Sequence, residues 1–381
     1  MKILVVHNAY QSHQIGGEDI VVANEIRALK AHLGKHNVFF YGVCNDDINP
    51  LKLSLKIWGD KTHYHKIYDL VKSQKIDIVH VHNFFPLLTP SVFAAAKAAG
   101  ASVVHTLHNF RWWCVSGDFY KNNAICEQCI GKKWMWPAIK QGCYRKNRVQ
   151  STVASAAFGW YRIKKYQEAI DAYFVLSNFQ KEKLKNWLPP EKLLLKPNSI
   201  EPPQIYYSPF AKKDYLFVGR IEPAKGIEVL LEAWQTLPTH FHLRLIGYDN
   251  ADFSQKYQRA NIQFLGKMEH KETLTKMSHA KFLLHTSLAY ETFGLTIVEA
   301  LARGTPVIGF NIGTRTELIQ HGKNGFLTTP RELKETLLQS FIYADYRAMT
   351  MRAKESAKAF FEENVILTQL AHYENLLRSK V

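Results

Sequence analysis

Two glutamates, Glu291 and Glu299, bracket the apolar stretch TFGLTIV with seven residues between them. The helical spacing of apolar residues predicts that a helix starts here, with Glu291 just outside it and Glu299 inside. At about 1.5 Å of rise per residue the two lie about 12 Å apart along the axis, close to the reach from a hexose across a diphosphate to a ribose. A carboxylate accepts hydrogen bonds from two hydroxyls at once. The pair suits the two ends of a nucleotide sugar, although a capping Glu291 and a solvated Glu299 would give the same pattern.

Anion-binding groups are expected beside this pair. The start of the predicted helix would supply unpaired backbone amides from Phe293, Gly294 and Leu295. In the segment VGRIEPAKGIEVLLEA, Arg220 and Lys225 precede another predicted helix. Cations beside a helix N-terminus, where free N–H groups and the helix dipole already favour negative charge, would bind a diphosphate well. Exposed cations are common, so this loop alone does not identify a site.

The elements that must position these residues alternate between strands and helices along the whole chain. Before residue 197 we expect strands at 2–6, 37–41, 77–81, 102–106 and 172–176, with helices at 20–33 and 91–99. The pattern restarts after a polar, proline-rich stretch, with strands at 214–218, 242–246, 262–266, 281–285 and 306–310 and helices at 226–237 and 272–280. This alternation predicts an α/β fold of two doubly wound Rossmann-like domains with parallel sheets. Ligands of such folds bind at the carboxyl ends of strands, here beside an interdomain cleft.

The expected boundaries follow from this pattern. An N-terminal domain over 1–196 contains a cysteine-rich insertion at 112–148, and a linker follows at 197–213. A second domain covers 214–350, and a helical tail at 351–381 could pack back on the N-terminal domain.

The composition narrows the class of protein. With 381 residues, 46% hydrophobic and 22% charged, the chain can form two cores and is too apolar to be disordered. No apolar run reaches the roughly 18 residues of a membrane span, and the start MKILVV lacks a signal-type cleavage site, so we expect a cytoplasmic protein.

The net charge is +16, and residues 1–200 carry 27 Lys and Arg against 14 Asp and Glu. Such a basic half favours a polyanionic partner, namely nucleic acid, an anionic membrane or a phosphorylated ligand, unless it is only a solvated surface.

Several motifs together resemble one enzyme family. The two glutamates, followed by ALARGTPVIGFNIGTRTELIQHGKNGFL, resemble the E-x7-E signature and C-terminal block of glycosyltransferase family 4, retaining GT-B enzymes of the group 1 type. GRIEPAKG resembles that family's GR(x)4KG phosphate loop, and IGGED resembles its N-terminal Gly-Gly loop. The match runs from about Met1 to Leu327. It implies a GT-B architecture with an acceptor-side N-terminal domain and a donor-side C-terminal domain.

The resemblance also implies roles for single residues on the donor side. Glu299 would hold the donor ribose, Glu291 the transferred sugar, and Arg220 with Lys225 the diphosphate. The expected catalytic residues are Glu291, His108, Arg220 and Lys225. Phe293, Gly294 and Leu295 would bind the donor through their amides.

On the N-terminal side the resemblance assigns five further positions. Gly16 and Gly17 match glycines that let the backbone approach the donor phosphates, where a Cβ would block the approach. His108, in TLHNF, matches a histidine that contacts the donor sugar, although a buried structural histidine is the alternative. Asn198, in PNSI, matches the asparagine of the family's Asn-Gly pair, and Ser199 replaces the glycine. Ser177 is expected to cap a helix.

The expected chemistry needs no catalytic metal. The chain contains no Asp-x-Asp motif, so the two cations and a helix dipole would stabilise the diphosphate. A retaining transfer often uses a carboxylate nucleophile, but the N-terminal half offers no convincing one. The resemblance implies that the leaving phosphate takes the acceptor's proton.

The insertion carries two further patterns. Cys114, Cys126, Cys129 and Cys143, spaced C-x11-C-x2-C-x13-C, could hold a structural zinc, with free thiols or a redox role as alternatives. Four tryptophans interleave with cations, which suits an anionic membrane surface unless the tryptophans form a small core. These residues are Trp112, Trp113, Trp134, Trp136, Lys132, Lys133, Lys140, Arg145, Lys146 and Arg148.

We therefore expect a retaining glycosyltransferase that moves a sugar from a nucleotide-diphosphate sugar, by preference a UDP-sugar, to a glycan or lipid-linked acceptor. We expect it to work at the inner face of the plasma membrane. Its expected role is in bacterial surface polysaccharide or lipopolysaccharide synthesis. One alternative is a basic nucleic-acid-binding α/β protein, although no nucleic-acid-binding motif is present. The other is a nucleotide-sugar epimerase of similar fold.

Overall fold

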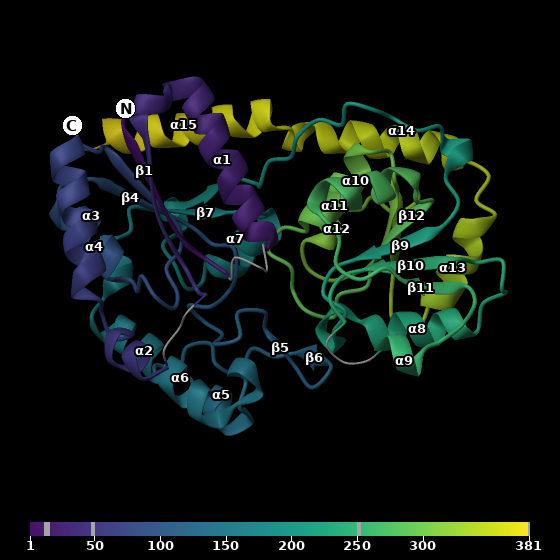
Figure 1. The fold of residues 1–381 in the computed structure, drawn as a ribbon, viewed down its shortest axis with the longest axis horizontal. Helices are drawn as coiled ribbons and strands as arrows, with labels where there is room; N and C mark the ends of the chain where they lie inside the picture. The colour runs from purple at the N-terminus through teal and green to yellow at the C-terminus, as the bar shows by residue number, and fades with distance from the viewer. Residues whose placement is uncertain (11–15, 47–49, 250–252, 380–381) are drawn as a thin grey trace. The chain divides into compact units, whose positions relative to one another are not determined.

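The chain forms two compact units, each built on a parallel sheet (Figure 1). The structure, a computed structural model, describes residues 1–10, 16–46, 50–249 and 253–379. The N-terminal unit comprises Met1–Phe119, Glu127–Ser199 and Glu362–Val381, and the C-terminal unit comprises Tyr120–Cys126 and Ile200–Phe361. Each unit is doubly wound and Rossmann-like, which confirms the predicted fold class.

The sheet of the N-terminal unit has the order β2-β1-β3-β4-β7-β8, and all its strands are parallel. The chain runs from β1 outward to β2 and then returns to β3 on the other side of β1, so the topological switch lies between β1 and β3. The strands read as continuous apolar runs because helices cover both faces of such a sheet. They are β1 (Ile3–Ala9), β2 (Val38–Cys44), β3 (Ile78–Asn83), β4 (Ser102–Thr106), β7 (Ala172–Val175) and β8 (Leu193–Leu195).

Helices α3 and α4 pack against each other, and α1 lies beside α15 (Figure 1). The helix α15 comes from the end of the chain, and its Ile366 and Tyr373 join Ile3 and Val5 of β1 in the core of the N-terminal unit. The helices of this unit are α1 (Gly17–Leu33), α2 (Pro50–Lys56), α3 (Lys61–Gln74), α4 (Ser91–Ala98), α5 (Trp136–Gln141), α6 (Arg148–Ile163), α7 (Asn178–Leu184) and α15 (Glu362–Arg378).

The sheet of the C-terminal unit has the order β11-β10-β9-β12-β13-β14, again fully parallel, with its switch between β9 and β12. Its strands are β9 (Tyr215–Val218), β10 (Leu243–Ile246), β11 (Ile262–Phe264), β12 (Phe282–His285), β13 (Val307–Phe310) and β14 (Gly325–Thr328). Its helices are α8 (Ile227–Gln235), α9 (Phe253–Lys256), α10 (His270–His279), α11 (Leu295–Ala302), α12 (Arg315–Leu318), α13 (Leu333–Phe341) and α14 (Tyr346–Ala357). A two-stranded hairpin, β5 (Tyr120–Lys121) and β6 (Ala124–Ile125), is grouped with this unit.

The tryptophans of the insertion mostly pack inside the protein. Trp112 and Trp113 are buried, and the Trp134 ring lies so close to Gly159 that a Cβ there would come within 2.4 Å of it. Trp136 is 65% exposed. Trp112, Trp113 and Trp134 therefore pack against Phe84, Trp187 and Gly159 of the N-terminal unit, rather than in a small core of the insertion's own. Within the described residues, no helix combines the length and the apolar character needed to cross a bilayer.

Candidate active site

The switch point of the C-terminal unit brings two of the predicted site residues into contact. Lys225 lies in the loop after β9 and Glu291 in the loop after β12, and Lys225 Nζ is 2.5 Å from Glu291 Oε1. The two loops are joined by hydrogen bonds from Leu288 N to the Ala224 carbonyl (2.9 Å) and from Thr286 Oγ1 to the Lys225 carbonyl (3.0 Å). Both charged side chains stay about a quarter exposed, at 24% and 21%, so a ligand can reach them.

Gly226 explains why the loops approach so closely. Its φ is +67°, in the left-handed region, and a Cβ on it would lie 2.0 Å from the Thr286 carbonyl oxygen. Only glycine satisfies both conditions. The glycine of the KG pair therefore sets the position of Lys225.

The environment of Glu291 keeps its carboxylate charged. Burial by itself raises the pKa of Glu291, but the neighbouring charges, Lys225 first among them, lower it to about 2. Arg315 contributes to the same lowering. Burial lowers the pKa of His285 to about 3, so this histidine is neutral, and lowers that of Arg315 to about 10. The site thus presents an ionised carboxylate and an ammonium group, one for hydroxyls and one for phosphate oxygens.

Arg220 has a different partner in this structure. Its side chain is 72% exposed, and its Nη2 lies 3.0 Å from Glu222 Oε1. It shares the β9–α8 loop with Lys225. To bind a diphosphate, the Arg220 guanidinium would leave its ion pair with Glu222 and pair with the phosphate oxygens instead.

Glu299 is buried and held by a histidine. It lies on α11, is 5% exposed, and accepts a hydrogen bond from His270 Nε2 on α10 at 2.7 Å. This hydrogen bond, as the largest effect, raises the pKa of His270. Glu299 is therefore not the solvated residue of the alternative interpretation. His270 was not predicted, because nothing in the sequence pattern indicates which helix faces Glu299.

The start of α11 is built as expected. Gly294 is its N-cap at a φ of +93°, and the amides of Ile297 and Val298 donate to the Gly294 carbonyl at 3.0 and 3.3 Å. The helix begins at Leu295, and Phe293 is buried just before it. The first amides of a helix have no acceptor within it and can serve an anion. No side chain caps α11, so Glu291 is not its cap.

In the N-terminal unit, the predicted Gly-Gly loop leads into α1. Gly16 is the N-cap, in an extended conformation, and its N–H donates to Asp19 Oδ2 at 2.8 Å. Asp19 Oδ1 lies 2.8 Å from His7 Nε2 at the end of β1. The helix begins at Gly17. Ile15 of the motif lies outside the described residues, and phosphate binding by these glycines stays a prediction.

His108 is the outer member of a chain of buried groups. Its Nε2 lies 2.9 Å from His82 Nδ1, and His82 Nε2 lies 3.1 Å from Glu25 Oε1. Burial holds the pKa of His108 well below its ordinary value, so the ring is neutral. His108 also lines a small pocket with Asn109 and Arg111. It is thus tied to the interior and borders this pocket.

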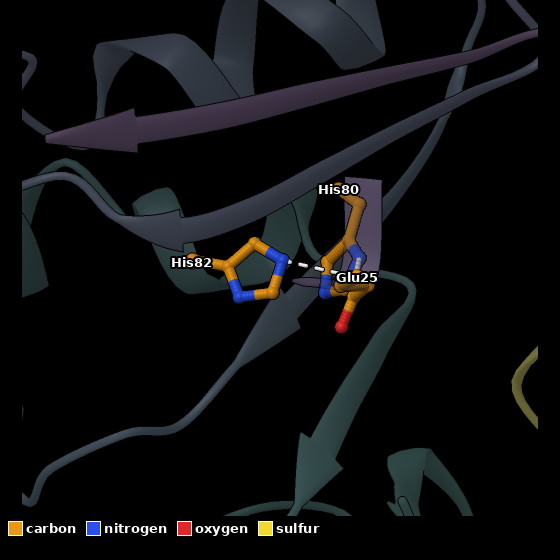
Figure 2. Close-up of side chains that lie close together, drawn as sticks. All are labelled: Glu25, His80 and His82. Atoms are coloured by element: carbon orange, nitrogen blue, oxygen red, sulfur yellow. Dashed lines mark hydrogen bonds and ion pairs between the residues drawn. The ribbon is translucent and has the colours of Figure 1, made fainter. Parts of the chain in front are cut away.

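Glu25 is the centre of this cluster (Figure 2). His80 Nδ1 lies 2.9 Å from Glu25 Oε1, on the side where His82 also approaches. Gln369 Nε2 donates to the same oxygen at 2.8 Å, and the Lys196 ammonium pairs with Oε2. Burial opposes the charge, but Lys196 and the two histidines hold the pKa of Glu25 well below its ordinary value. The carboxylate is therefore ionised.

The donor atoms of Glu25, His80 and His82 lie within 4.8 Å of one another, which is close enough for a metal ion. Lys196 already neutralises the carboxylate, however, and His80 Nδ1 also contacts the Tyr373 hydroxyl at 2.7 Å. Since each ligand atom has a protein partner, we interpret the group as a hydrogen-bonded network.

The cysteines predicted to hold zinc do not gather in this way. Within the described part of the chain, Cys114, Cys129 and Cys143 form no group with sulfurs at ligand distance, and none of the three is in a disulfide. Cys126 is grouped with the other unit. Zinc at the four cysteines stays a prediction, which metal analysis of the purified protein would check.

Two further predicted positions, Ser177 and Asn198, lie in the N-terminal unit. Ser177 caps α7, its Oγ accepting from Gln180 N at 3.2 Å, as expected. Asn198 is buried, and its Oδ1 has no hydrogen-bond partner among the described residues.

Two family models match consecutive parts of the chain. "Glycosyltransferase Family 4" matches residues 15–203, and "Glycosyl transferases group 1" matches residues 204–350.

Curated relatives are also glycosyltransferases. An uncharacterized glycosyltransferase of Methanocaldococcus jannaschii is 31% identical over 42% of this chain and 48% of its own length. The O-antigen chain mannosyltransferase B of Escherichia coli is 29% identical over 42% of this chain and 45% of its own. N-acetyl-alpha-D-glucosaminyl L-malate synthase of Bacillus anthracis is 24% identical over 80% of this chain and 76% of its own. The chain thus spans about half the length of the first two relatives.

Solved structures share the fold over the whole chain. Sucrose-phosphate synthase from Thermosynechococcus elongatus superimposes with a TM-score of 0.72 at 18% identity, covering 100% of both chains. HepE of Anabaena, in complex with UDP and glucose, gives 0.64 at 18% identity and 99% coverage of both. The lipopolysaccharide outer core galactosyltransferase WaaB gives 0.67 at 18% identity and full coverage. The GT-B fold class is therefore confirmed. With both Rossmann-like domains matched in turn by the two models, the chain belongs to glycosyltransferase family 4, the group 1 glycosyltransferases.

Proposed function

We propose that this glycosyltransferase moves a sugar from a nucleotide-diphosphate sugar to a glycan or lipid-linked acceptor, with retention of configuration. The 2.5 Å contact between Lys225 and Glu291 at the switch point of the C-terminal unit carries this proposal. It joins a hydroxyl-binding carboxylate to a phosphate-binding ammonium at the edge of the sheet where open α/β folds bind ligands.

The donor would lie across this edge. The ammonium of Lys225 has three donors, so it can keep Glu291 and still bind the diphosphate. Glu291 would accept hydrogen bonds from the transferred sugar, and Glu299, oriented by His270, would accept those of the ribose. Arg220 and the first amides of α11 would add to the stabilisation of the diphosphate charge.

The reaction we propose needs neither a catalytic metal nor an enzymatic base. The chain lacks an Asp-x-Asp motif, and cations with a helix N-terminus supply the charge stabilisation instead. The acceptor hydroxyl attacks the anomeric carbon from the face on which the bond to the phosphate breaks. The leaving phosphate oxygen takes the hydroxyl proton, so the configuration is retained.

A UDP-sugar donor and a surface-glycan product are supported by relatives. HepE was solved with UDP, and the names of WaaB and the E. coli mannosyltransferase refer to lipopolysaccharide and O-antigen. We further propose that the protein works in the cytoplasm, at the inner face of the plasma membrane. The exposed Trp136 among the cations of the insertion supports this placement.

Nucleoside diphosphate release from a panel of sugar nucleotides tests the proposal. One donor, expected to be a UDP-sugar, should release its diphosphate faster when a lipid or glycan extract is added, and EDTA should not change the rate. Lys225→Ala should slow the release strongly. Loss of activity with EDTA would contradict metal independence, and isomerised donor without acceptor would indicate an epimerase.

A further inference from the structure

We propose that Arg315 is a positioning residue for the transferred sugar: its buried guanidinium holds the loop before Glu291 and supplies the cation that keeps the Glu291 carboxylate ionised while Lys225 binds the diphosphate. This inference rests on the proposed function, in which Glu291 binds the sugar and Lys225 the diphosphate. Arg315 is 0% exposed and would act on the sugar through Glu291. All three residues belong to the C-terminal unit.

Arg315 is a charged side chain that lies entirely inside this unit. It is the first residue of the short helix α12. Burial lowers the pKa of Arg315 to about 10, so the guanidinium still carries its charge at neutral pH. A buried charge is costly unless a group of opposite sign accompanies it. Glu291 is the carboxylate whose charge favours the protonated form of Arg315.

Two hydrogen bonds from Arg315 hold the backbone beside the site. Its Nε donates to the Phe310 carbonyl at the end of β13, at 2.9 Å. Its Nη2 donates to the Ala289 carbonyl in the loop after β12, at 3.3 Å. The guanidinium therefore joins the carboxyl ends of two neighbouring strands, the edge at which open α/β sheets bind ligands. Since Ala289 lies two residues before Glu291, this contact fixes the backbone from which the carboxylate extends.

The third nitrogen of the guanidinium is not used in this way. Nη1 of Arg315 is buried and has no hydrogen-bond partner among the residues that the structure describes. A buried donor without an acceptor is costly, and each such group in a native protein calls for an explanation. Holding two carbonyls does not by itself account for a buried charge with an unused donor.

The charge on Arg315 becomes important when the donor binds. Without a ligand, Lys225 Nζ lies 2.5 Å from Glu291 Oε1 and is the first of the charges that lower the pKa of Glu291. A diphosphate would share that ammonium and bring negative charge beside the carboxylate, which raises its pKa. His285 Nε2 lies 4.0 Å from Glu291 Oε1, but burial lowers the pKa of His285 to about 3, so this ring is neutral. Arg315 is the other cation that lowers the pKa of Glu291, and it is buried too deeply to pair with the phosphate itself.

The ionised form of Glu291 is the one that suits a sugar. An ionised carboxylate only accepts, so it can take hydrogen bonds from two hydroxyl groups, whereas a protonated carboxyl group must also donate one. Without Arg315, burial and the diphosphate would raise the pKa of Glu291, and the sugar contact would be lost as the pH falls. With Arg315 in place, the contact is kept across the neutral range.

The pH dependence of sugar-nucleotide turnover tests the charge. The ratio of kcat/KM in Arg315→Gln to that in the wild type should fall at least about threefold from about pH 8 to about pH 5.5, because a buried glutamate without its cation has a pKa of about 6 or higher. Arg315→Lys keeps the charge, so its ratio should not vary with pH. In a Glu291→Gln background the variation caused by Arg315→Gln should disappear, because the titrating group is gone.

Arg259→Gln is the matched control. Arg259 is partly buried in the same unit and donates through Nη1 to the Trp234 and Gln235 carbonyls at 3.1 and 2.6 Å. It therefore also holds two carbonyls, at the end of α8. Its loss should give a ratio that is constant with pH. A ratio for Arg315→Gln that is equally constant would mean that Arg315 only holds the loop, and would overturn the proposed role of its charge.

Carbon NMR of glutamate-labelled protein reads the Glu291 carboxyl group directly, with its signal assigned by its loss in Glu291→Gln. In the wild type this carboxylate should stay ionised at about pH 5, both free and with saturating UDP, whereas in Arg315→Gln with UDP it should take up a proton above that pH. Binding of UDP shows that the variant is folded. Should Arg315→Gln not fold, Arg315→Lys replaces it, and its Glu291 must stay ionised at about pH 5 with UDP bound. Proton uptake above that pH in the wild type or in Arg315→Lys would overturn the inference.

The two proposals fail in different ways. If no sugar nucleotide is turned over, the proposed function is wrong, while the NMR comparison still tests the effect of Arg315 on Glu291. If Glu291→Gln lowers turnover but Arg315→Gln gives a ratio that does not vary with pH, only this inference is wrong.

Discussion

Glu299 is the residue whose role separates binding from chemistry most clearly. In the proposed function it binds the ribose, which is held alike in the ground state and the transition state. Glu299→Ala should therefore weaken nucleoside diphosphate binding about tenfold or more, since each hydrogen bond to a charged group contributes roughly 1.5–3 kcal/mol. Titration calorimetry with UDP measures this. Glu335→Ala, an exposed glutamate of α13, is the control, and equal affinities of the two variants would refute the ribose role.

The protonation of His270 should make the stability of the folded protein depend on pH. The hydrogen bond to Glu299 raises its pKa above the ordinary 6.5, so protonated His270 stabilises the folded state fully below that pH. This stabilisation is lost as the pH rises through the raised pKa. Between about pH 6 and pH 9, the Tm of the wild type should fall more than that of His270→Gln. Parallel curves for the two proteins, measured by thermal unfolding, would contradict it.

At the residue scale, the sequence predicted the donor side better than the interior. Lys225 and Glu291 belong to motifs with a required spacing, and the structure brings them into contact. Glu25 and His82 carry no such signal. Two histidines two positions apart in VHVHN face the same side of a strand, but no local pattern tells which helix supplies the carboxylate opposite them.

At the element scale, the close approach of the loops after β9 and β12 requires a glycine at position 226. Gly226→Ala should destabilise the C-terminal unit by several kcal/mol, because its Cβ would lie 2.0 Å from the Thr286 carbonyl oxygen at a φ of +67°. Gly266→Ala is the matched control, since Gly266 has a φ of +70° with nothing within 4 Å of its Cβ. It should cost only the left-handed conformation, about 1–2 kcal/mol. Chemical denaturation compares the two, and equal losses would mean that the loop contact is not what requires glycine.

The expected strands were found because buried parallel strands are apolar runs that stand out from their surroundings. Two strands were missed, β8 with three residues and β14 with four, although β11 and β7 have the same lengths and were predicted. The helix α3 was also missed, since its sequence KTHYHKIYDLVKSQ is mostly polar and buries Ile67 and Val71. Its N-cap Asp60, which accepts from the Thr62 and His63 amides, was the available signal.

At the scale of the whole molecule, the charge distribution predicts membrane association. The insertion should bind anionic vesicles in a salt-sensitive manner, each cation near the surface contributing about 1 kcal/mol. Lys140→Glu, on α5 near the exposed Trp136, should therefore weaken vesicle binding more than tenfold. Lys323→Glu, an equal change of charge on the C-terminal unit, should weaken it less. Sedimentation with anionic and neutral vesicles measures both, and equal binding to the two vesicle types would rule out the electrostatic part.

Two domains could be inferred from the whole sequence, because the strand–helix pattern stops and restarts. The tail at 351–381 was expected to pack back on the N-terminal domain; from Glu362 on it belongs to that unit, and its earlier part belongs to the C-terminal unit. The helix α15 buries Ile366 and Tyr373 in the N-terminal core, and its Gln369 reaches Glu25, but an amphipathic tail does not specify which surface it covers.

The central claim is that Glu291 binds the transferred sugar and Lys225 the diphosphate, and one comparison tests it most directly. Wild type and Glu291→Ala are titrated with UDP and then assayed for turnover of the preferred sugar nucleotide. We expect nearly unchanged affinity for UDP and at least about tenfold lower turnover, because only the sugar contact is lost. Unchanged turnover in Glu291→Ala would contradict the claim, since the transferred sugar would then be bound elsewhere.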